Sequence, residues 1–125
     1  MNEVKSFYEV IEGISAKDLR YKPDSYEFVM QALNFTQKEF KKEGHVSGRE
    51  LLEGIRKFAL TQYGPMAKTV LQHWGITKTA DFGNIVFNMI EEGLLSKTAD
   101  DTHHDFDGVY DFETAFRYIV KDLQL

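Results

Sequence analysis

The sequence predicts a mainly helical fold, a domain of about six helices. Three observations lead to this prediction. Apolar residues recur at helical spacing over most of the chain. Glycines divide the middle of the chain into segments of helix length. A length of 125 residues with 42% hydrophobic content fits a single domain, 1–125, with a real core.

Residues 1–44 are expected to form the N-terminal helices. Asn2 can cap the first, and its core-facing residues are Val4, Phe7, Tyr8, Ile11 and Ile14. Gly13 should limit its length, because glycine is a poor residue inside a helix. An irregular connection over residues 15–24 follows, since Pro23 disfavours a helical residue before it.

The second helix is predicted to start near Asp24 or Ser25 and to run to about Glu43. Its apolar residues cover more than one stripe, so it should contact two neighbours. Gly44 is expected to terminate it.

Residues 45–95 form the predicted central three-helix unit, and the first of its helices has the clearest start. Ser47 and Glu50 have the spacing of a capping box, in which each side chain accepts a hydrogen bond from the other's backbone N–H. Val46 and Leu51 stand at the positions of a hydrophobic staple. Gly64 is the expected stop.

Two further helices follow in this unit. Pro65 suits the first position of a short helix that Gly75 ends, with Ile76 folding back onto Leu71. The next begins near Ala80, carries a broad apolar stripe, and stops at Gly93.

Residues 96–111 are polar and strongly acidic, so they are expected to form an acidic loop or hairpin. Val109 to Phe112 could pair as a short strand with Leu94 to Lys97. Asp111 can cap a C-terminal helix over 112–125, where apolar residues again repeat at helical spacing.

Composition narrows the function classes. The sequence has no cysteine, which excludes disulfides, thiol catalysis and cysteine-ligated zinc. No apolar run approaches the roughly 20 residues of a membrane span, and the polar N-terminus is unlike a signal peptide. A cytoplasmic location without membrane contact is therefore expected. Of the net charge of −5, residues 76–111 carry −6 and the rest of the chain about +1.

The central unit and the predicted hairpin together resemble a winged helix-turn-helix. That resemblance implies a third helix in the DNA major groove and a wing on the backbone. The charges argue against this use, because the third helix offers Asp81, Glu91 and Glu92 against Lys78. Phosphate binding needs Lys or Arg instead, so nucleic acid is an unexpected partner for this face.

Three segments resemble a family of small bacterial proteins of unknown function. They read HVSGRELLEGIRKFALTQYGPMAKTVLQHWGI, DFGNIVFNMIEEGLLSKT and GVYDFETAF, and the similarity extends from about Tyr21 to Arg117. It implies no activity, cofactor or site residue.

A candidate metal site lies in the acidic loop. His103, His104 and Asp105 are ligand types that suit Zn²⁺, Ni²⁺ or Mn²⁺. Adjacent residues of one loop rarely converge without a ligand from elsewhere, so a solvated loop without a metal is the favoured interpretation. No Ser-His-Asp set, P-loop or dinucleotide-binding motif is present.

The leading functional prediction is a non-catalytic domain with an acidic face that binds another protein or itself. The first alternative is a DNA-binding or transcription-associated protein, which would use the side formed by Lys38, Lys41, Lys42, Arg49, Arg56 and Lys57. The second alternative is a metal-dependent enzyme that uses His103, His104 and Asp105. The largest pocket should separate these classes: an apolar groove favours a peptide, and a polar cleft with converging His and Asp favours chemistry.

Overall fold

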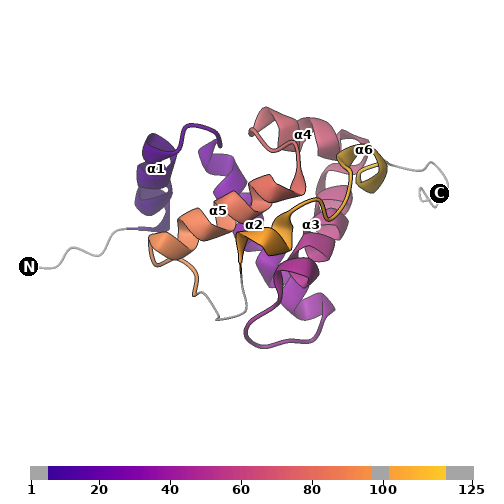
Figure 1. The fold of residues 1–125 in the computed structure, drawn as a ribbon, viewed down its shortest axis with the longest axis horizontal. Coiled ribbons are helices and arrows are strands. Elements are labelled where there is room, and N and C mark those ends of the chain that lie inside the picture. Colours follow the sequence, from indigo (N-terminus) through magenta and orange to yellow (C-terminus); the bar gives the residue numbers. More distant parts are fainter. Residues whose placement is uncertain (1–5, 97–101, 118–125) are drawn as a thin grey trace, which may run out of the picture.

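A computed structural model describes residues 6–96 and 102–117 and shows a mainly helical chain (Figure 1). In chain order its elements are α1 (Phe7–Lys17), α2 (Pro23–Glu39), α3 (Gly48–Tyr63), the 3₁₀ turn η1 (Gly64–Met66), α4 (Ala67–His73), α5 (Thr79–Glu91), the 3₁₀ turn η2 (His103–Phe106) and α6 (Phe112–Ala115). The predicted fold class is therefore confirmed. The count of about six full helices is not, because α6 has only four residues in the described part of the chain. None of the described helices is both long and apolar enough to cross a membrane.

Helix α5 crosses the middle of the molecule (Figure 1). It packs against α2 and against η2, and α1 lies at one end of the molecule while α4 and α6 lie at the other. From Thr79 to Ile90 no α5 residue is exposed. A DNA-reading helix has to present a free face to the groove. The interpretation of α5 as such a helix of a winged unit is therefore not confirmed.

Helix α1 starts and ends later than the sequence predicts. Its cap is Ser6, whose hydroxyl accepts a 3.2 Å hydrogen bond from the N–H of Glu9. The predicted cap Asn2 lies outside the described residues. The prediction that Gly13 limits the helix is wrong, because α1 continues to Lys17. Burial of Ile11 and Ile14 favours the helix by more than the roughly 1 kcal/mol that a helical glycine costs.

Helix α2 ends before the predicted residue. The chain turns at Lys41, whose φ of 54° is left-handed, and the N–H of Lys42 reaches the carbonyl of Gln37 at 2.8 Å. This is the hydrogen-bond pattern of a Schellman motif, with lysine at the position that glycine usually takes. Gly44 does not end the helix, because it already lies in the loop between α2 and α3.

The capping box and the glycine stops predicted for the central unit are confirmed, but Pro65 lies in η1 and α4 begins only at Ala67. Ser47 and Glu50 form both hydrogen bonds of the capping box, at 2.8 and 3.1 Å. Gly75 has a φ of 96°, and the N–H of Ile76 bonds the Leu71 carbonyl at 2.9 Å. Gly93 repeats this arrangement with a φ of 78°.

The predicted hairpin is wrong for the described residues. Residues 94–96 and 109–111 are irregular, Phe112 starts α6, and Lys97 lies outside the described part of the chain. Contacts with the helices replace strand pairing. The N–H of Val109 bonds the Thr79 hydroxyl at 3.1 Å, and the Tyr110 hydroxyl donates to the Leu52 carbonyl at 2.9 Å.

Phe106 is one of the buried aromatic side chains that hold the segment after residue 101 against the core. Phe106 is buried and packs against Gly83 of α5 and Gly48 of α3. A side chain at Gly83 would overlap the Phe106 ring. Glycine at this place therefore allows η2 to lie directly on α5.

Candidate functional site

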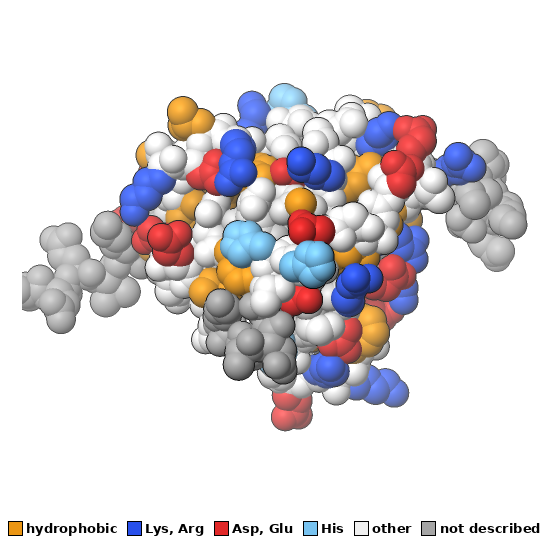
Figure 2. Space-filling view, in the orientation of Figure 1, with side chains coloured by type: hydrophobic (Ala, Val, Ile, Leu, Met, Phe, Trp, Pro, Cys, Tyr) orange, Lys and Arg blue, Asp and Glu red, His pale blue; other side chains and the backbone are white. Residues whose placement is uncertain are grey.

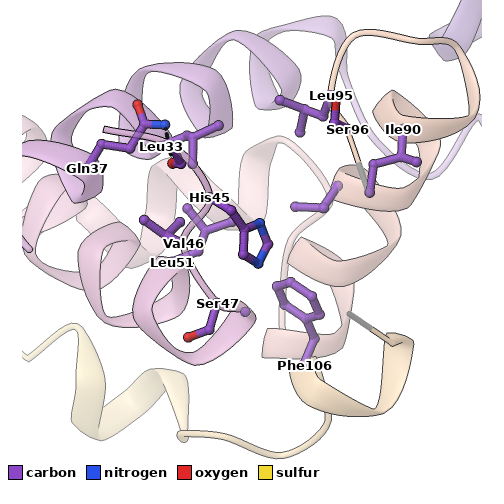
Figure 3. A pocket seen from close by; sticks show the side chains of 13 residues that line it. Leu33, Gln37, His45, Val46, Ser47, Leu51, Ile90, Leu95, Ser96 and Phe106 are labelled. Atoms are coloured by element: carbon purple, nitrogen blue, oxygen red, sulfur yellow. Dashed lines mark hydrogen bonds between the residues drawn. The ribbon is translucent and has the colours of Figure 1, made fainter. Parts of the chain in front are cut away.

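The structure contains an apolar cavity of about 330 Å³ between α2, α3 and α5. The loop between α2 and α3 closes one side of it, and Phe106 of η2 lies at its base (Figure 3). The exposed residues Gly44, His45 and Ser96 belong to its lining, so the cavity reaches the surface.

Side chains from sequence-distant helices form the apolar wall. Helix α2 contributes Leu33, the loop before α3 contributes Val46, and α3 contributes Leu51. Across from them Figure 3 shows Ile90 of α5 and Leu95 after it. The sequence predicts apolar stripes on α2 and α5 and a hydrophobic staple of Val46 and Leu51, which supply much of this wall. What it did not indicate is that they leave a space between them, since that depends on how three helices meet.

Polar groups occur at the rim of the cavity rather than in its wall. The side chain of Gln37 donates a 2.8 Å hydrogen bond to the carbonyl of Gly44 and so holds the loop against α2. The Ser47 hydroxyl is used in the capping box of α3. His45 also lines the cavity, and its ring is directed toward Phe106 in the view of Figure 3.

A shallow basic depression adjoins the cavity. Its residues are Asn34, Gln37, Lys38, Lys41, Lys42 and Glu43, and Gln37 belongs to both lining sets. The cavity and the depression therefore form one continuous surface at the C-terminal end of α2. We call it the α2 rim surface: the cavity together with Lys38, Lys41 and Lys42.

The six cations of the predicted DNA-binding side do not form a free basic face. Salt bridges within the described residues join Lys42 to Glu50 at 2.8 Å, Arg56 to Glu53 at 2.6 Å and Lys57 to Glu39 at 3.9 Å. The pairing of Arg56 with Glu53 also lowers the pKa of that carboxyl, mainly through the hydrogen bonds. Lys38, Lys41 and Arg49 have no such salt bridge in the part of the chain that is described, and all three are exposed.

The predicted metal-binding residues do not converge. The His103 ring stacks on Phe87 with centroids 4.0 Å apart, while His104 lies 3.4 Å from a carboxylate oxygen of Asp107. The carboxylate of Asp105 accepts a 2.9 Å hydrogen bond from the N–H of Thr102 and caps η2. Among residues 6–96 and 102–117 no three His, Asp or Glu side chains are placed to hold a metal ion.

The acidic residues of α5 also have structural roles. Asp81 is 7% exposed and accepts hydrogen bonds from the Tyr21 hydroxyl at 2.6 Å and from the N–H groups of Thr77 and Lys78. Asn84 donates to the same Tyr21 hydroxyl at 2.9 Å. Burial, and then the hydrogen bond to Asp81, raise the pKa of Tyr21 above its usual value. This buried network fixes α5 against the connection between α1 and α2.

Several of the described acidic side chains pair with lysines. Figure 2 shows acidic and basic side chains interspersed over the side that it presents. Glu92 pairs with Lys17 at 2.9 Å, and Glu113 pairs with Lys68. Asp100 and Asp101, which contribute to the acidic stretch of the sequence, lie outside the described residues.

Comparisons with protein-family models, with curated proteins and with solved structures give no match. The resemblance to small bacterial proteins of unknown function stays a prediction. The α2 rim surface is thus the feature of the described structure on which a function can be argued.

Proposed function

We propose that the protein is a non-catalytic interaction domain that binds a segment of a partner protein at the apolar cavity. The observation that carries this proposal is the cavity of about 330 Å³ that reaches the surface between α2, α3 and α5. It lies at the lower end of the range of about 300–1,000 Å³ typical of ligand pockets. One or two apolar side chains of a partner would suit it better than a cofactor.

The wall of the cavity supports a peptide partner. Leu33, Leu51 and Ile90 come from three different helices and offer only hydrocarbon surface. Such a groove binds amphipathic helices through apolar anchors spaced one turn apart. The polar groups at the rim, which include Gln37 and backbone atoms of the 44–47 loop, would meet the polar flanks of the anchor.

The cavity replaces the acidic face as the basis for the interaction hypothesis. Asp81 is directed inward, and Glu92 and Glu113 are in salt bridges. These three carboxylates already have partners within the described part of the chain.

The two alternatives receive less support. DNA binding through α5 would need side chains that α5 does not expose between Thr79 and Ile90. Three of the six cations on the other proposed DNA side are in salt bridges. A metal-dependent reaction at His103 and His104 would need at least three ligands that converge, and the described residues contain no such group.

A peptide-display selection against the immobilised full chain tests the proposal. Peptides selected on the natural protein should lose binding to Leu33→Trp, because the larger ring fills the cavity from α2. Met30→Trp is the matched control, since Met30 is also half-buried on α2 but does not line the cavity. Circular dichroism should show both variants folded. Selected peptides that bind Leu33→Trp as tightly as the natural chain would refute the cavity as the site.

A further inference from the structure

We propose that the partner segment recognised at this surface is acidic beside its apolar anchor. The anchor enters the cavity, and the flanking carboxylates meet the cations Lys38 and Lys41, which line the depression beside it. This inference rests on the proposed function and adds the chemistry of the partner.

The first argument is continuity. Gln37 lines the cavity, and Lys38 follows it at once in α2. A segment whose anchor occupies the cavity therefore has Lys38 and Lys41 close by in the adjoining depression. An acidic flank would reach them without a change in the fold.

The second argument is charge that the molecule leaves uncompensated. Over residues 37–50 the described salt bridges use Glu39 and Glu50, the first with Lys57 and the second with Lys42. No described salt bridge involves Lys38, Lys41, Arg49 or Glu43, so the cations exceed the remaining anion by two. The whole chain has a net charge of −5. A positive rim on an acidic protein favours an acidic partner by complementarity.

The third argument is the backbone of Lys41. Lys41 has a φ of 54°, which is a left-handed conformation. Among the described residues, it is the one residue other than glycine with such a φ. A side chain in that conformation is strained, and glycine is the residue that commonly ends a helix in this way. Strained residues concentrate where a side chain is needed for function. The ammonium group of Lys41 is the feature that glycine would lack.

Three display libraries test the inference. All share the same apolar anchor positions, and their flanking positions hold acidic, neutral or basic residues. The acidic library should yield the tightest binders, and their affinity should fall as salt rises. The double variant Lys38→Glu/Lys41→Glu should select from the basic library instead. Equal enrichment from the neutral or basic library on the natural chain would overturn the inference while leaving cavity binding intact.

Charge-removing variants of the rim separate an effect on binding from an effect on folding. Lys41→Gly should weaken an acidic binder about threefold, and Lys38→Gln/Lys41→Gln about tenfold, as expected for exposed ion pairs. Lys41→Gly should keep or raise thermal stability, so weaker binding cannot come from unfolding. Lys22→Gln is the control, because Lys22 is exposed at the opposite end of α2. An unchanged affinity of Lys41→Gly and of the double variant would remove the role of the rim.

Two further outcomes bear on the proposals. If no library yields a peptide whose binding Leu33→Trp abolishes, the proposed function fails together with this inference. Dodecanoate serves as a probe for a small amphiphile, since it also combines an apolar chain with an anion. Saturable binding of dodecanoate that Leu33→Trp abolishes, with no peptide selected, would replace the protein partner by a small lipid-like ligand.

Discussion

The hydroxyl group of Tyr21 donates a 2.6 Å hydrogen bond to the carboxylate of Asp81, sixty positions along the chain. Tyr21 is 2% exposed and lies between α1 and α2, while Asp81 is in the first turn of α5. The same carboxylate accepts hydrogen bonds from the backbone of Thr77 and Lys78. One side chain thus caps α5 and ties it to the N-terminal helices.

Loss of this carboxylate should destabilise the fold strongly. Asp81→Ala should lower the free energy of unfolding by about 3 kcal/mol, because it removes the cap of α5 and leaves buried donors without an acceptor. Tyr21→Phe should cost about 1–2 kcal/mol. Urea unfolding of both single variants and the double variant measures their coupling. A coupling energy near zero would mean that the 2.6 Å contact contributes nothing to stability.

As pH rises, the protein should begin to lose stability at a lower pH than it would if only the lysines lost their charge. Burial is the largest cause that raises the pKa of Tyr21, and likewise that of Tyr110. Unfolded phenols titrate near their usual pKa of 10.0, so above that pH the folded state holds more protons than the unfolded state. The free energy of unfolding then falls as pH rises.

Urea titrations at about pH 8 and about pH 11 check this prediction. Tyr21→Phe should show a smaller loss between the two pH values than the natural chain, because it removes one of the groups whose proton is retained on folding. An equal loss in both proteins would contradict the assignment to Tyr21.

Replacing each of two helical glycines by alanine should change the free energy of unfolding in opposite directions. A side chain at Gly54 of α3 would overlap Thr36 of α2, which is fully buried, whereas nothing lies within 4 Å of a side chain at Gly13. Gly54→Ala should lower the free energy of unfolding by about 1–2 kcal/mol net, since overpacking outweighs the gain in helix propensity. Gly13→Ala should raise it by about 0.5–1 kcal/mol. Thermal unfolding followed by circular dichroism compares the two, and a stabilising Gly54→Ala would show that α2 and α3 are packed less closely.

Replacement of Lys41 by glycine should stabilise the free protein. Its left-handed φ of 54° is strained for lysine and easy for glycine. Lys41→Gly should therefore gain about 0.5–1 kcal/mol in urea unfolding. Gly44→Ala is an informative comparison, because no heavy atom lies within 4 Å of its added side chain and its φ is not left-handed. A stability loss in Lys41→Gly would indicate that the lysine side chain supports the fold instead.

Local signals in the sequence were sufficient to predict where several helices start or end. The capping box of Ser47 and Glu50 and the glycine stop at Gly75 appear as predicted. The α2 end was missed because Lys41 takes a conformation that sequence patterns assign to glycine. The hairpin prediction was wrong because Val109 and Tyr110 bond to helices that lie far away in the chain.

The candidate site, too, was predicted only in part from the sequence. The sequence identified Lys38, Lys41 and Arg49 as candidate binding cations, but it gave them equal weight with Lys42, Arg56 and Lys57. Only the structure separates the two groups, because salt bridges such as Lys57 with Glu39 join different helices. The cavity beside them could not be predicted, since it is bounded by residues from α2, α3 and α5 together.

By itself the sequence determined the helical class and the helix ends that are set by hydrogen bonds between residues a few positions apart. Tertiary structure alone decided that α5 is central, that Asp81 faces Tyr21, and that Leu33 and Ile90 border a space. The physical reason is the distance along the chain over which each interaction acts. A cap depends on neighbours within about one turn, whereas burial and cavity shape depend on which helix surfaces meet.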